Sequence, residues 1–156
     1  MGLLGALLKK FRPLEVEDEF FGHLVYMKMP KGRIAYWEAK RLFSPSGREI
    51  ELFIDAPGPE QAPAELQREF FAAVERNYSK IVTAVESVLR SQFEEWTGKP
   101  LAAPFDSEFT MTSFSIPHAP LGVAQWEMSY ESRSDANHLL TVSFQGETAT
   151  RVTIDG

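Results

Sequence analysis

The chain has 156 residues, 44% of them hydrophobic and 24% charged, a balance that predicts one globular domain and excludes wholesale disorder. Cysteine is absent, which excludes disulfides, thiolate metal sites and a cysteine nucleophile and suits a cytoplasmic protein. The net charge is −6, and residues 101–156 hold seven acidic and two basic side chains, so we expect no nucleic-acid partner, whose phosphates need Lys and Arg.

The first 13 residues form an apolar segment ahead of the domain, which we expect over residues 14–156. Its apolar residues recur at spacings of three and four, which predicts a short amphipathic helix ended by Pro13. We interpret it as an interaction segment that packs on its own domain, is exchanged in a homodimer, or makes weak contact with a membrane surface through Lys9, Lys10 and Arg12. We favour the first two, because its apolar face is small. The segment consists of Leu3, Leu4, Leu7, Leu8 and Phe11.

Three strands are predicted in the first third of the domain. Residues 15–19 are acidic and are interpreted as a solvated linker. Residues 20–29, 33–43 and 48–55 resemble strands, and the short turns between them contain Pro and Gly. Short turns join antiparallel neighbours, so we expect an antiparallel meander.

A long amphipathic helix is predicted over residues 63–97. Pro63 is acceptable in its first turn, while Gly98 and Pro100 would end it. An unbroken helix of this length would be too long for a compact domain, so we expect it to protrude or to bend near Arg76 and Asn77. We expect one buried stripe formed by Leu66, Phe70, Val74, Ile81, Val85, Leu89, Phe93 and Trp96, widened by Phe71, Tyr78, Val82 and Val88.

Four more strands are predicted, over residues 109–116, 124–130, 138–144 and 148–154. Apolar and polar residues alternate most clearly in the second of these. The fold class is therefore α+β: an antiparallel sheet of order βββ-α-ββββ packed on one long helix, with a short N-terminal helix. Trp37, Trp126 and Tyr130 are expected in its core.

No group of residues predicts a catalytic, cofactor or metal site. His23, His118 and His138 are far apart in the sequence, and Glu94 and Glu95 are adjacent rather than on one helix face. The glycines match no phosphate-binding or dinucleotide-binding motif. Basic residues are common in the first strands and are expected to protect solvated strand edges: Lys28, Lys31, Arg33, Lys40, Arg41 and Arg48.

One stretch resembles a known group of proteins. Ile50-Glu51-Leu52-Phe53-Ile54-Asp55-Ala56 is followed by Pro59, Gln61 and a helix with Phe70-Phe71, Val74, Asn77-Tyr78 and Ile81. This arrangement, over about residues 48–90, is similar to bacterial domains of unknown function, some of them grouped with immunity proteins of toxin systems. The resemblance implies a fold and a protein partner, and it implies no catalytic residues.

Two functions remain open at this point. The resemblance, the acidic second half and the lack of a reactive motif favour a non-enzymatic protein-interaction domain without a cofactor. The alternative is a thioesterase-type enzyme or acyl-ligand domain, since a long helix cradled by antiparallel strands is similar to the hot-dog fold. That enzyme would need a carboxylate near the helix start, where Asp55 and Glu60 lie.

Overall fold

The computed structural model describes residues 12–118 and 124–156. The predicted N-terminal interaction segment, Leu3 to Phe11, lies outside the described residues. Part of the loop expected after residue 116 lies outside them too.

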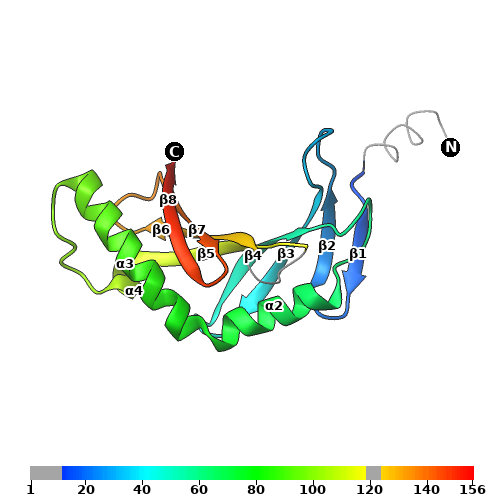
Figure 1. The fold of residues 1–156 in the computed structure, drawn as a ribbon, viewed down its shortest axis with the longest axis horizontal. Coiled ribbons are helices and arrows are strands. Elements are labelled where there is room, and N and C mark those ends of the chain that lie inside the picture. Colours follow the sequence, from blue (N-terminus) through cyan, green and yellow to red (C-terminus); the bar gives the residue numbers. More distant parts are fainter. Residues whose placement is uncertain (1–11, 119–123) are drawn as a thin grey trace.

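The described chain forms one eight-stranded sheet in which the strands lie side by side in sequence order. The α+β class and the mostly antiparallel pairing are confirmed. The first four strands form one meander and the last four another, with the helices between them (Figure 1). The strands are β1 (Glu15–Asp18), β2 (Gly22–Met27), β3 (Tyr36–Phe43), β4 (Arg48–Asp55), β5 (Phe109–Ile116), β6 (Gln125–Ser132), β7 (Leu139–Gln145) and β8 (Thr148–Asp155).

The prediction of three strands before the helix was wrong, because the acidic segment interpreted as a linker is β1. Glu15 pairs with Val25 and Glu17 with His23, so their side chains project from the same face of the sheet. Val16 and Asp18 alternate with them and face the helices. The segment alternates between the two faces as a strand does, but only one of its two inward positions, Val16, is apolar. The alternation was therefore too weak to predict a strand from the sequence.

Two main helices replace the single helix that was predicted: α2 (Glu65–Arg76) and α3 (Tyr78–Thr97). The break falls at Asn77, in the Arg76–Asn77 step where a bend was expected. Figure 1 shows the pair forming a wide V around the outside of the sheet. A third, four-residue helix, α4 (Phe105–Glu108), leads into β5 and was not predicted.

The buried stripe of the helices differs from the predicted one at both ends. Leu66 and Trp96 are 41% and 39% exposed, and Phe70 is only partly buried. Rotating the first turns by one residue places Gln67 and Phe71 toward the sheet instead. The buried positions of α2 and α3 are Gln67, Phe71, Val74, Ile81, Val85, Leu89 and Phe93.

Buried Gln67 explains this rotation, because its side chain ties the start of α2 to the sheet. Its Oε1 accepts a hydrogen bond from the Ala64 N–H at 2.9 Å, which caps the helix. Its Nε2 donates to the carbonyl oxygens of Asp55, at 2.8 Å, and Pro117, at 3.3 Å. One amide thus joins α2 to the ends of two neighbouring strands.

Those neighbours, β4 and β5, form a parallel pair, which the antiparallel prediction did not include. Leu52 lies opposite Phe114, and Ile54 opposite Ile116. A parallel pair needs a long crossover, and α2, α3 and α4 supply it. This pair alone joins the two meanders into one sheet.

The core lies between the sheet and the helices. Trp37, Trp126 and Tyr130 are buried there, as predicted. Phe71 stacks on Phe114 with ring centroids 5.6 Å apart and is surrounded by other aromatic rings. Because α2 and α3 pack on one face of the sheet, its other face carries no helix in the described structure, and both ends of the sheet stand up on that side (Figure 1).

Candidate functional site

The candidate site is the helix-free face of the sheet, which we call the open face. Alternation along each strand decides which residues reach it. Glu38 and Lys40 of β3 project there, while Trp37 and Ala39, which alternate with them, are buried in the core. The acidic residues that reach the open face come from five strands: Glu15, Glu17, Glu38, Glu49, Glu51, Asp55, Glu127, Glu131 and Asp155.

This face concentrates the negative charge of the molecule. Among the residues that the structure describes, strand alternation places nine carboxylates on this face and two permanent cations, Lys40 and Arg151. The resulting balance of −7 exceeds the formal charge of the whole chain, which is −6. The remainder of the chain is therefore close to neutral, and the sheet face attracts cations at long range.

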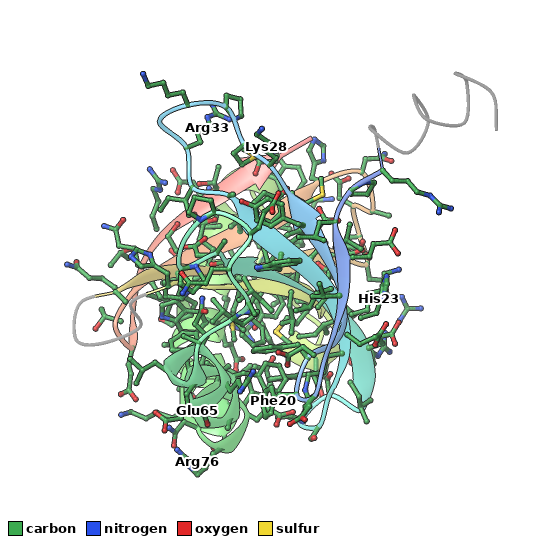
Figure 2. All side chains as sticks on the ribbon, turned by 90° about the vertical axis from the view of Figure 1, so that its right-hand side faces the viewer. Phe20, His23, Lys28, Arg33, Glu65 and Arg76 are labelled. Carbon is green, nitrogen blue, oxygen red and sulfur yellow. The ribbon has the colours of Figure 1, made fainter. Side chains whose placement is uncertain are left out.

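His23 lies at the β1 margin of the open face between two carboxylates. Its Nδ1 is 2.7 Å from Glu17 Oε1, and its Nε2 is 3.4 Å from Glu15 Oε2. The hydrogen bond to Glu17, aided by the charges of both carboxylates, raises the pKa of His23 above its usual value. Figure 2 shows His23 projecting from β2 on the side away from α2, whereas Phe20 lies beside that helix.

A hollow of 620 Å³ lies on the open face over β2, β3 and β4. Val25 and Phe53 give its floor an apolar centre, and Glu38, Glu49 and Glu51 lie among its charged walls. Tyr36 packs edge-on against Phe53, with ring centroids 5.9 Å apart. At the end of β3, the side chain of Leu42 is 59% exposed. The hollow therefore combines an apolar surface, which can lose its water on binding, with acidic side chains around it.

A row of small hydroxyl residues continues the open face across the middle of the sheet. Ser113, Ser129 and Thr141 lie opposite one another on β5, β6 and β7 and are each at least 91% buried. The Ser129 and Thr141 hydroxyls are hydrogen-bonded at 3.0 Å. Ser113 and Ser129 also line a hollow of 620 Å³ to which Glu49, Glu51 and Glu131 contribute.

Asp55 ends β4 on the open face, beside a second hollow of 660 Å³ that Glu127 and Arg151 also line. Burial raises the pKa of the Asp55 carboxyl, although the backbone N–H and charge of His118 partly oppose the rise. Glu60, the other carboxylate considered for an enzyme, is exposed in the loop before α2. The structure therefore does not bring Asp55 and Glu60 together toward the apolar layer under the helices.

The basic residues of the first strands do not form one patch. Lys28, Lys31 and Arg33 are exposed in the loop between β2 and β3, which stands at the end away from α2 (Figure 2). Arg41 is on the helix side, with its guanidinium 4.3 Å from the centre of the Phe20 ring. Lys40 reaches the acidic face instead.

The three histidines remain apart, and each has its own surroundings. His138 Nδ1 lies 2.7 Å from Asp135, and its ring packs edge-on against Trp96. Across residues 12–118 and 124–156, no three His, Asp or Glu side chains are grouped closely enough to hold a metal ion. At the end of α3, Glu94 accepts a hydrogen bond from the Leu101 N–H at 3.3 Å, and Glu95 is exposed.

The open face was missed as a unit by reasoning from the sequence. Its clearest local signal is β4, where Glu49 and Glu51 alternate with Ile50 and Leu52. That pattern identifies a strand with one solvent-exposed face, but it does not show that the acidic residues of distant strands share that face. The strand order and the parallel β4–β5 pair supply this information.

Comparisons of the chain with protein-family models, with curated proteins and with solved structures found no match. In the part of the chain that the structure describes, no helix has the length and apolar character required to cross a bilayer. The chemistry of the open face is therefore the guide to function.

Proposed function

We propose that the protein is a non-enzymatic interaction domain whose open face binds a basic surface of a partner protein. The observation that carries this proposal is the gathering of nine carboxylates, from both halves of the chain, on the sheet face that carries no helix in the described part of the chain. A partner rich in Lys and Arg would be steered toward this face and held in register by it.

The composition of the face supports a protein partner more than a small cation. Protein interfaces combine a centre that loses its water with a polar rim. Val25 and Phe53 provide such a centre, and the exposed side chain of Leu42 adds apolar area at its margin. Acidic side chains surround these residues, so the partner should carry an apolar side chain among its basic ones.

An immunity-like role is the narrower form of this proposal. It rests on the similarity of residues 48–90 to bacterial domains that include immunity proteins. β4 lies within that stretch and supplies Glu49, Glu51 and Phe53 to the open face. Such a partner would be a toxin whose basic surface the open face covers.

The thioesterase-type alternative is less well supported by the geometry. Asp55 faces the open side of the sheet rather than the core, and Glu60 is exposed. An acyl chain between sheet and helices would also have to displace tightly packed aromatic side chains such as Phe71 and Phe114. Thioesterase turnover that is lost in Asp55→Ala, with the fold intact, would favour this alternative.

A peptide-display selection on the immobilised protein tests the proposal and does not require the partner to be identified first. We expect enriched peptides to be rich in Lys and Arg with at least one large apolar residue. A synthetic copy of the best peptide should bind roughly tenfold or more weakly to Glu38→Lys/Glu51→Lys, which removes about 1.4 kcal/mol or more of binding free energy.

The matched control is Glu69→Lys/Glu95→Lys, which changes the net charge equally at helix positions away from the open face. It should keep most of the peptide affinity. Enrichment of acidic or neutral peptides would contradict the proposal, as would equal losses in both double variants, because net charge rather than the open face would then explain binding.

A further inference from the structure

β8 is the last strand of the sheet, and the backbone groups on its outer edge meet no further strand among the described residues. An edge of this kind is a template for pairing with another strand. Natural sheets usually protect such edges with short strands, bulges, inward charges, proline or lysine.

The two ends of the sheet differ in this respect. β1 has only four residues, and three of them are acidic. β8 has eight residues, without proline or lysine. Its one irregularity is a bulge at Thr150, because Arg151 pairs with Ser143 while Ala149 pairs with Phe144. The bulge lies before Arg151, and residues 151–155 beyond it pair regularly with β7.

The side chains of this edge are complementary to those of the same edge in a second copy of the chain. Arg151, Thr153 and Asp155 lie on the open face, and Val152 and Ile154 lie on the helix side, partly buried against the core. Two copies that pair antiparallel about a two-fold axis and keep their open faces on the same side place that axis at one residue of β8.

Of the registers centred on residues 151 to 153, only one places opposite charges across the interface. An axis at Arg151 would place two guanidiniums opposite each other, and an axis at Val152 would pair Arg151 with Thr153. An axis at Thr153 pairs each Arg151 with Asp155 of the second copy and each Val152 with Ile154. We infer that β8 is a homodimer interface that joins two copies through Thr153 into one continuous sheet.

This inference is independent of the proposed function, although the two are compatible. The partner of β8 is a second copy of this chain, and pairing leaves the hollow over β2, β3 and β4 uncovered at the other end of the sheet. The dimer would place both open faces on one side, with one acidic hollow toward each end.

Sedimentation equilibrium of the full chain over a range of concentrations tests the inference. We expect a monomer–dimer equilibrium that Asp155→Arg and Arg151→Asp each weaken roughly tenfold, because each change creates two like-charge pairs per dimer. The combined variant Arg151→Asp/Asp155→Arg should restore dimerisation, since it exchanges the charges and keeps the register.

Glu69→Arg, which makes the same charge change as Asp155→Arg but on α2, should leave the equilibrium unaltered. Circular dichroism must show that each variant is folded before it is scored. A wild-type protein that is monomeric even at millimolar concentration would overturn the inference. A dimer whose dissociation constant neither single change alters would also overturn it, as would a combined variant that does not restore dimerisation.

Discussion

Asp18 shows how a single carboxylate organises one corner of the fold. It accepts hydrogen bonds from the backbone N–H groups of Phe20 and Phe21, each at 2.8 Å, and so closes the turn between β1 and β2. It also pairs with Arg68 of α2 at 3.0 Å. Burial raises the pKa of Asp18, but the two N–H groups and Arg68 together outweigh it, and the net pKa is lowered.

Asp18→Ala should lower the free energy of unfolding at pH 7 by about 2–4 kcal/mol, because it removes the acceptor of two N–H groups and one of the two carboxylates that pair with Arg68, the other being Glu65. Since the folded pKa is below the unfolded value of about 4, this stabilisation is present above about pH 4 and is lost as pH falls through the folded pKa. Urea unfolding measured between about pH 7 and about pH 2.5 should show the difference between wild type and variant shrinking in acid. Glu19→Ala, next to it and exposed, should change little.

At the scale of the element, α2 contains one fully buried aromatic side chain. Phe71 is fully buried and packs against the rings of Phe20, Phe21, Phe43 and Phe114. Leu66, on the same helix, is 41% exposed. Comparing the two positions therefore distinguishes the effect of burial in the core from the effect of hydrophobicity alone.

Phe71→Ala should cost about 3–5 kcal/mol of unfolding free energy, because it empties a well-packed site. Leu66→Ala should cost under roughly 1 kcal/mol, since most of its transfer free energy is not gained in the folded state. Chemical denaturation of both variants measures this. Equal losses would mean that α2 lies rotated about its own axis, with Leu66 turned toward the sheet.

The elements themselves were largely predictable, and their exceptions have physical causes. β5 was predicted at its observed bounds, because residues 109–116 lie between clear breaks. The helical stripe was displaced because hydrophobicity favoured Leu66 and Phe70, whereas the hydrogen bonds of Gln67 decide which side of α2 faces the sheet. A buried amide with three partners has no signature in a pattern of apolar residues.

At the scale of the molecule, the open face carries a cost in stability. Nine carboxylates on one sheet face repel one another, and dissolved salt screens that repulsion. Apart from Glu15 and Glu17, which lie in the acidic segment 15–19, these carboxylates form no local charge run in the sequence, because they alternate with inward-facing residues along their strands. Only the assembled sheet brings them together.

Raising the salt concentration from about 20 to 300 mM should therefore stabilise the wild-type protein by roughly 0.5–1 kcal/mol. Glu38→Lys/Glu51→Lys should reduce this gain, and Glu69→Lys/Glu95→Lys should preserve more of it. Thermal unfolding in both buffers gives the comparison. A wild-type protein that salt destabilises would show that attraction, rather than repulsion, dominates its surface charges.

The parallel contact between β4 and β5 has a consequence for how the chain folds. Each meander closes through short loops, so its strands find their neighbours locally. The contact between β4 and β5 instead joins Glu51 to Ser113 across the whole helical crossover, and closing that long loop costs entropy before any pairing is gained. We therefore expect the two half-sheets to form early and their union along Leu52, Ile54, Phe114 and Ile116 to be the slower step.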